Sequence, residues 1–135
     1  ALGCAQLDRI EELVARKREI FAFYLEQLQA AIPGARMNPE PTNCRNSYWM
    51  PTLVLPTELA GQRDRVLAQM GQAGIDARIF FQPLSDTPVF ANLPPVSTPR
   101  AHDLAQRAFN LPSYHDLVAV DQQRVVDAIL QGLQL

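Results

Sequence analysis

An apolar stripe near the N-terminus constrains the fold more than any other feature of this sequence. Its members recur at spacings of three and four residues, which predicts one long amphipathic helix over residues 2–32. They are Leu7, Ile10, Leu13, Val14, Phe21, Tyr24, Leu25, Leu28 and Ile32. At about 1.5 Å per residue the helix would span roughly 45 Å, longer than a domain of 135 residues needs. We expect either a solvated face over a core stripe, or one end that packs on something outside this chain.

The composition limits the partners and the compartment. Apolar residues make up 47% of the chain, which is enough to bury one hydrophobic core without metals or disulfides. The net charge of −2 argues against a nucleic-acid surface, and no apolar run is long enough to cross a membrane. Cys4 and Cys44 lack the spacing of a zinc site and fit a reducing cytoplasm at least as well as a disulfide. We therefore expect residues 1–135 to form a single cytoplasmic domain without a metal.

Two or three short strands are predicted after the long helix. Residues 48–55 are rich in aromatic and β-branched side chains, and Pro51 among them indicates an edge strand or a bulge. Residues 35–38 give a weaker strand pattern, and an apolar run within residues 74–84 gives a strong one. Because a helical pattern separates the two stronger strands, a parallel pairing between them is open.

The helix before the second strong strand has a well-marked end. Thr57 is its candidate N-cap, and Gly74 fits the left-handed residue that follows a helix C-terminus. Ile75 would then contact Met70, which is the hydrophobic pair of a Schellman ending. This pattern predicts both where the helix stops and how the next strand leaves it.

Two more helices complete the fold. Pro99 fits the first position of a helix whose small-residue face reaches Ala108. The last helix is expected to open at Asp121 as its cap, with Val120 packing on Val125. About four helices with a small mixed or antiparallel sheet of two or three strands indicate an α+β two-layer sandwich.

A single arginine stands inside the apolar strand after Gly74. Arg78 stays charged, so it must point to water, meet a ligand anion or pair with a helix carboxylate. Phe80 and Phe81 follow it and should point to opposite faces, with one of them in the core. The proline-rich residues 82–98 are long enough to predict an ordered functional loop.

The chain offers few groups for catalysis. Ser85 and Ser113 lack the G-x-S-x-G context, and no H-E-x-x-H, P-loop or G-x-G-x-x-G occurs. His102 is typical of an exposed helix position and His115 of a loop. Lys17 is the only lysine, so Schiff-base chemistry would have to use it or come from elsewhere. We expect no catalytic residue in this chain.

Four blocks of the sequence resemble the DegT/DnrJ/EryC1/StrS family of pyridoxal-phosphate-dependent sugar aminotransferases. Leu2-Gly3-Cys4-Ala5-Gln6-Leu7-Asp8-Arg9-Ile10 is similar to the family's A-x-G-x-x-Q-L helix, which leaves the large domain. Gly74-Ile75-Asp76-Ala77-Arg78-Ile79-Phe80-Phe81-Gln82-Pro83-Leu84 is similar to G-I-x-x-R-x-F-F/Y-x-P-L. The weaker blocks are Tyr48-Trp49, and Leu104-Ala105-Gln106-Arg107 with Asn110-Leu111-Pro112-Ser113. Together they span nearly the whole chain in the family's order.

The resemblance implies the C-terminal small domain of a fold-type I aminotransferase, with residues 1–32 as the helix that links it to a large domain. In that family a lysine of the large domain holds pyridoxal phosphate, the substrate is a nucleotide-linked keto sugar, and glutamate usually gives the amino group. It also implies a perosamine-synthase-like branch, a homodimer, and a role in making cell-surface polysaccharide or lipopolysaccharide. Lys17 does not match the cofactor lysine, so the chain alone is expected to be inactive.

The resemblance further implies that Arg78, Phe80, Phe81 and Ser85 contact the substrate, although many relatives carry histidine where Ser85 stands. It implies no cofactor contact from this chain. A different interpretation stays open, namely a free-standing, non-catalytic binding or dimerisation module with the same fold. The long first helix would then be its interface.

Overall fold

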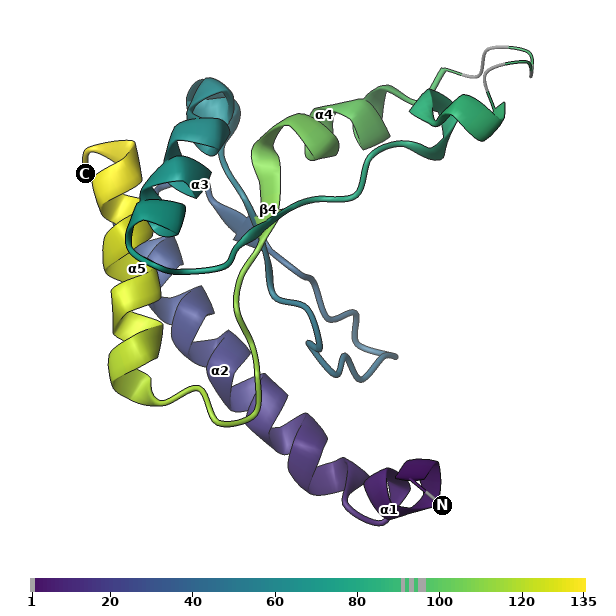
Figure 1. The fold of residues 1–135 in the computed structure, drawn as a ribbon, viewed down its shortest axis with the longest axis vertical. Coiled ribbons are helices and arrows are strands. Elements are labelled where there is room, and N and C mark those ends of the chain that lie inside the picture. The colour runs from purple at the N-terminus through teal and green to yellow at the C-terminus, as the bar shows by residue number, and fades with distance from the viewer. Residues whose placement is uncertain (1, 91, 93, 95–96) are drawn as a thin grey trace.

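The computed structural model describes residues 2–90, 92, 94 and 97–135, which form helices around one small sheet (Figure 1). The α-helices are α1 (Leu2–Leu7), α2 (Ile10–Ala31), α3 (Arg63–Gln72), α4 (Pro99–Arg107) and α5 (Ala119–Leu133). Short 3₁₀ segments are η1 (Thr57–Gln62), η2 (Leu84–Asp86) and η3 (Pro88–Phe90). The strands are β1 (Arg36–Met37), β2 (Thr52–Val54), β3 (Arg78–Ile79) and β4 (Ala108–Asn110). Across these ranges, none of the helices combines the length and apolar character needed to cross a membrane.

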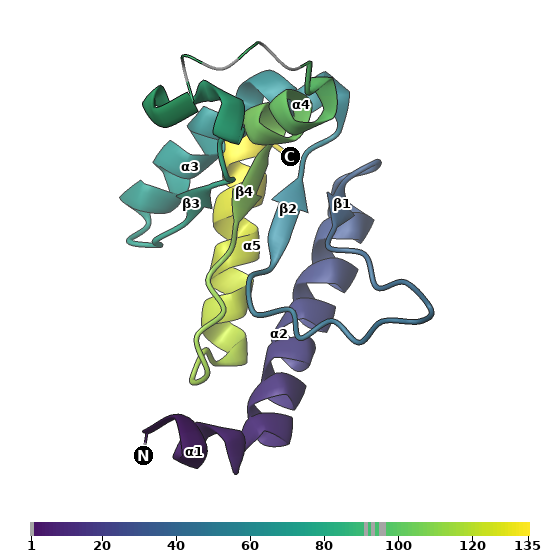
Figure 2. The ribbon, with the colours of Figure 1, turned by 90° about the vertical axis from the view of Figure 1, so that its right-hand side faces the viewer.

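The fold is the α+β two-layer sandwich that the sequence predicts. Helices α2, α3 and α5 lie on one side of the sheet, and Figure 2 shows α2 and α5 behind it. Leu53 and Phe109 face each other across β2 and β4, and both are fully buried against these helices. Burial of large apolar side chains between the layers is the main stabilising term of such a fold.

The sheet has four strands rather than two or three, in the order β1-β2-β4-β3, and every neighbouring pair is antiparallel. The strand missing from our prediction is β4, which takes a central position. Ala108 was expected on a helix, but α4 ends at Arg107, and Ala108 pairs with Val54 in the sheet. The parallel pairing does not occur, because β4 lies between β2 and β3.

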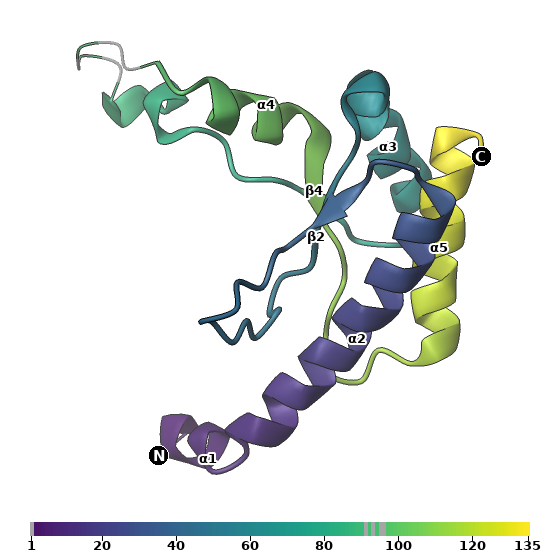
Figure 3. The same cartoon turned by 180° about the vertical axis from the view of Figure 1, so that it is seen from behind.

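The first helix is interrupted, contrary to the expectation of one element over residues 2–32. The chain turns at Asp8-Arg9, and Figure 3 shows α1 bent away from α2. Leu7 is 67% exposed, whereas Tyr24 and Leu28 are fully buried. Only the second half of the apolar stripe packs on the core, and helices depend mostly on such packing for their stability.

The end of α3 follows the predicted Schellman geometry. Gly74 has φ +72°, its N–H donates to Gly71 at 3.0 Å, and the Ile75 N–H donates to the Met70 carbonyl at 2.9 Å. Ile75 packs against the core. The segment from Thr57, however, begins as η1, and α3 proper starts at Arg63.

The other boundary predictions need correction. Helix α5 starts at Ala119 after Val118, and no side chain caps it. Val120 is 67% exposed, so the predicted packing of Val120 on Val125 is wrong. Strand β2 covers only residues 52–54 of the predicted 48–55, and Tyr48, with φ +49°, has a left-handed conformation that a strand cannot include.

Candidate functional site

One face of the sheet is not covered by α2, α3 or α5, and we call it the open face. Side chains alternate along a strand, so the neighbours of the buried Leu53 and Phe109 point to this face. The register places Thr52, Asn110 and Arg78 in one row across three strands. A second row on the same face contains Arg36, Val54, Ala108 and Phe80, the last through its N–H to the Ala108 carbonyl.

A hollow of about 400 Å³ opens on this face. Its lining comprises Arg36, Met37, Asn38, Pro39, Thr52, Val54, Phe80, Leu104, Arg107 and Ala108. Arg107 is held by Asp103 at 2.7 Å and by the Leu55 carbonyl, and its hydrogen bond keeps the pKa of Asp103 below the ordinary value. Arg36 has no salt bridge among the described residues. The hollow therefore combines apolar side chains with two arginines, of which Arg107 is paired with Asp103.

Arg78 does not line the hollow, but it shares a row with Thr52, which does. Its Nε and Nη2 donate to the same oxygen of Asp76, at 3.2 and 2.8 Å. This hydrogen bond raises the pKa of Arg78, and the side chain is 76% exposed. The partner is a loop carboxylate two residues upstream rather than the helix carboxylate we considered. Exposed pairs of this kind add little stability, so a ligand anion can replace Asp76 at small cost.

The other three predicted site residues are divided between the hollow and its surroundings. Phe80 is half-buried and lines the hollow, whereas Phe81 is 61% exposed. The two rings meet edge to face with centroids 5.5 Å apart, and neither belongs to the core, contrary to our expectation. Ser85 lies in η2, exposed, where its hydroxyl donates to Asp86 at 3.2 Å. The structure thus brings Arg78 and Phe80 onto one face and places Phe81 and Ser85 outside its hollow.

Sequence reasoning missed a buried polar pair on the open face. Thr52 and Asn110 are each only 7% exposed, and the Thr52 hydroxyl donates to Asn110 Oδ1 at 2.8 Å. Asn38 Oδ1 accepts the Thr52 backbone N–H at 2.7 Å. The available signal was Asn110 itself, a polar residue closing the apolar run that starts at Ala108.

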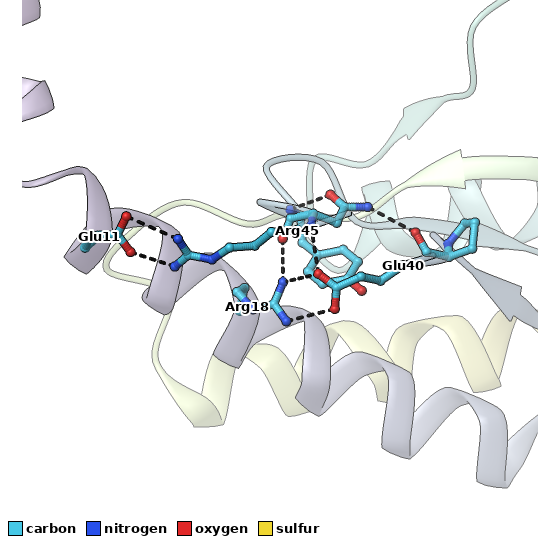
Figure 4. Close-up of polar contacts among 7 residues, drawn as sticks. Glu11, Arg18, Glu40 and Arg45 are labelled. Atoms are coloured by element: carbon cyan, nitrogen blue, oxygen red, sulfur yellow. Dashed lines mark hydrogen bonds and ion pairs between the residues drawn. The ribbon is translucent and has the colours of Figure 1, made fainter. Parts of the chain in front are cut away.

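Ion pairs fix the loop between β1 and β2 to helix α2 (Figure 4). Arg18 contacts both oxygens of Glu40, at 2.6 and 2.9 Å, and Arg45 contacts both oxygens of Glu11, at 3.1 and 2.6 Å. The hydrogen bond from Arg18, assisted by the Asn46 N–H, lowers the pKa of Glu40 to about 2. The wall of the hollow that contains Asn38 is therefore held in place by α2.

The segment after β4 is held by the same helix. Tyr24 donates to the Pro112 carbonyl at 3.1 Å, Lys17 donates to the Ser113 carbonyl, and Arg16 donates to the carbonyls of His115 and Leu117 at 3.1 and 2.5 Å. Partial burial lowers the pKa of Lys17. The only lysine of the chain is thus a structural donor to a backbone carbonyl.

The remaining reactive groups, His102, His115, Cys4 and Cys44, lie outside the lining of the hollow. His102 contacts the Thr98 carbonyl at 2.8 Å and Asp86 at 3.0 Å, which together raise its pKa. His115 lies in a loop 3.7 Å from Glu12. Cys4 and Cys44 are free and exposed. Within the part of the chain that the structure describes, no three His, Cys, Asp or Glu residues are placed to hold a metal.

Several known proteins are similar to this chain in sequence or in structure. GDP-perosamine synthase of Caulobacter vibrioides is 31% identical over 134 residues, which cover 98% of this chain and 36% of that protein. The enzyme of the same name from Vibrio cholerae is 30% identical over 118 residues, 87% of this chain and 32% of that protein. The crystal structure of the aminotransferase TlmJ from Streptoalloteichus hindustanus superposes with a TM-score of 0.83 at 26% identity, over 98% of this chain and 35% of TlmJ.

The match to a protein family is almost as long as the chain. The chain spans about a third of the length of these relatives. Residues 1–130 match the DegT/DnrJ/EryC1/StrS aminotransferase family model. On this evidence the chain belongs to the DegT/DnrJ/EryC1/StrS aminotransferase family.

Proposed function

We propose that this chain is the C-terminal small domain of an enzyme that makes amino sugars from nucleotide-linked keto sugars by transamination. Family membership and the names of the two GDP-perosamine synthases support a sugar substrate. The observation that carries the proposal is the position of Arg78 and Phe80 on one open face beside a hollow. A concave site with an apolar wall and a few polar groups is the usual form of a small-molecule site.

In this proposal the open face is the substrate side of the active site. Arg78 binds an anionic group of the nucleotide sugar or of the amino donor, which we take to be glutamate. A guanidinium suits this task because its fork of donors matches carboxylate and phosphate oxygens. Phe80 forms the apolar wall, and Phe81 and Ser85 contact the substrate from outside the hollow. The enzyme would work as a homodimer in the cytoplasm, a compartment that the free cysteines support.

Pyridoxal phosphate supplies the electron sink that transamination requires, and the residues of this chain do not fit its attachment site. Attachment needs a lysine amine free to react with a carbonyl. Lys17 donates to the Ser113 carbonyl instead, and no lysine lines the hollow of the open face. We therefore assign cofactor binding to a separate large domain and propose that the isolated chain is inactive.

The isolated chain tests the assignment of the cofactor. It should give no aldimine absorbance with pyridoxal phosphate, and borohydride should trap no adduct at Lys17. Transaminase turnover together with a reducible adduct at Lys17 would refute the proposal.

The full-length enzyme tests the role of Arg78. Arg78→Gln should lower kcat/KM for amino transfer by about tenfold to a hundredfold, the loss expected for a hydrogen bond to a charged group. Arg100→Gln, which removes an exposed arginine of α4, is the matched control and should leave kcat/KM unchanged. Equal activity of both variants would exclude Arg78 from substrate binding.

A further inference from the structure

We propose that Asn110 and Arg78 form a two-donor site for an oxyanion, a carboxylate or a phosphate, and that Thr52 positions Asn110 for this role. The inference rests on the proposed function only in taking that oxyanion to belong to a substrate of the same reaction. It gives a role in binding to Asn110 and Thr52, which are not among the substrate contacts predicted from the sequence.

The register of the sheet brings the two donors together. Asn110 lies directly opposite Arg78 on β3 and directly opposite Thr52 on β2. Side chains that face each other across antiparallel strands have Cβ atoms roughly 5 Å apart. The amide and the guanidinium are therefore neighbours on one face, although 32 positions separate them in the sequence (110 minus 78). One ligand group can contact both.

The amide of Asn110 has unused donors. Its Oδ1 accepts the Thr52 hydroxyl, whereas its Nδ2 has no hydrogen-bond partner among the described residues. The residue is 93% buried (100 minus the 7% that is exposed), yet Nδ2 is not among the fully enclosed atoms that lack a partner. A buried amide rarely leaves its donors unpaired. Nδ2 is thus a solvent-reachable donor set in a rigid, mostly buried frame.

Thr52 determines the direction of that donor. Its backbone N–H donates to Asn38 Oδ1 at 2.7 Å, which fixes the residue at the edge of the hollow. Its hydroxyl donates to Asn110 Oδ1, so the carbonyl half of the amide faces β2. The planar amide then turns its NH₂ half away from β2, and β3 with Arg78 lies on that other side of β4. Thr52 is a positioning residue in this arrangement.

The two groups together recognise negative oxygen. The NH₂ of Asn110 and the guanidinium of Arg78 have only donors to offer, and one of them is permanently charged. Asp76 already places a carboxylate oxygen 2.8 Å from Arg78 Nη2, which shows that the guanidinium can hold such a group here. A ligand oxyanion would replace Asp76 and use the second donor as well. The carboxylate of an amino donor and the phosphate of a nucleotide are the two sources of this group.

Binding to the isolated chain can be followed at both donors by NMR. Sodium glutamate and inorganic phosphate are titrated separately at constant ionic strength, because salt screens exposed charges. At least one anion should shift the Asn110 side-chain NH₂ and the Arg78 Nε–H signals with the same Kd. Saturation by glutamate identifies the amino donor as the source of the oxyanion, and saturation by phosphate identifies the nucleotide.

Variants separate positioning from simple structural support. Asn110→Asp, which replaces the donor by an acceptor, should weaken binding by about tenfold or more. Thr52→Val should weaken it by several-fold and Thr52→Ser should restore it, since serine keeps the hydroxyl. Arg100→Gln should leave Kd unchanged. Circular dichroism and thermal unfolding show whether each variant is folded. If Asn110→Asp does not fold, the comparison of Thr52→Val with Thr52→Ser tests the inference.

Three outcomes would overturn the inference. The first is the absence of any shift up to about 0.1 M anion, far above the millimolar range of weak specific binding. The second is a shift of Arg78 without Asn110, which would leave the proposed role of Arg78 intact. The third is equal binding by Thr52→Val and Thr52→Ser. Failure of the proposed function is detected by a different experiment, because the full-length Arg78→Gln enzyme would then keep its turnover.

Discussion

Phe21 of α2 and Tyr48 of the β1–β2 loop stack face to face, with ring centroids 3.6 Å apart and planes 6° from parallel. Both residues are buried, and Arg18 lies over the Tyr48 ring at 5.2 Å. Tyr48 also has a left-handed backbone, φ +49°, which is unfavourable for a tyrosine. The stacking therefore holds the loop in a conformation that its backbone would not select.

Replacement of Phe21 should destabilise the whole domain. Phe21→Ala is expected to lower the free energy of unfolding by about 3–5 kcal/mol, the range for loss of a buried aromatic ring. Phe81→Ala, which removes an exposed ring outside the core, should change it by less than about 0.5 kcal/mol. Urea denaturation measures both. Equal effects of the two substitutions would show that the Phe21–Tyr48 stack is not part of the core.

The ion pair between Arg18 and Glu40 should make stability depend on pH in the acid range. The pKa of Glu40 is about 2 in the folded chain and 4.5 in a free carboxyl, so the folded state favours the ionised form. The resulting stabilisation is fully present above about pH 4.5 and is lost as pH falls through about pH 2. Glu40→Gln should flatten this part of the curve of unfolding midpoint against pH.

A carboxyl of α2 without an ion pair provides the control for Glu40. Glu26→Gln removes an exposed carboxyl of α2 that has no salt bridge among the described residues. It should preserve the acid dependence of the unfolding midpoint. A Glu40→Gln curve that overlays the Glu26→Gln curve would exclude the ion pair as its source.

Gly132 should not tolerate a side chain. A Cβ at this position would lie 2.7 Å from the Val66 Cα, where α5 crosses α3. Gly132→Ala must push the helices apart and is expected to cost about 1–3 kcal/mol of stability. Gly71→Ala in α3 has nothing within 4 Å of its new Cβ and should instead stabilise the chain by roughly 0.5–1 kcal/mol. Thermal unfolding of the two variants should therefore shift in opposite directions.

Asp76 should weaken anion binding, because its carboxylate accepts hydrogen bonds from Arg78 in the free chain. Asp76→Asn is expected to tighten the binding of the same oxyanion by up to about fivefold, because the exposed pair it removes is worth no more than about 1 kcal/mol. Asp64→Asn removes an exposed carboxylate elsewhere and corrects for the change in net charge. NMR titration gives both values of Kd. Weaker binding by Asp76→Asn than by Asp64→Asn would mean that Asp76 orients Arg78 rather than competing for it.

Local sequence signals predicted the parts of the fold that are decided locally. Gly74 and Ile75 end α3 as expected, since a Schellman ending depends on a left-handed residue and on a contact within the same turn. The common face of Arg78 and Phe80 has the same local origin, the two-residue period of a strand, although that period was used only to separate Phe80 from Phe81. The two-layer class followed from the pattern of several helices around a few short strands.

The missed features depend on contacts between distant parts of the chain. Strand β4 has three residues, too few for a periodic pattern, and it exists because Thr52 and its neighbours pair with it. The Thr52–Asn110 hydrogen bond joins residues 58 positions apart. The break at Asp8-Arg9 occurs where the apolar stripe has nothing in the described chain to cover it. No window of sequence contains both partners of these contacts.

Helix α2 has a mechanical consequence for the open face. The β1–β2 loop is joined to it through Arg18 and Arg45, and the segment after β4 is joined to it through Arg16 and Lys17. Helix α2 is therefore the common anchor of the two segments that lie on either side of the sheet. If the open face binds a substrate as proposed, the two segments that flank it would move together with α2 and not separately.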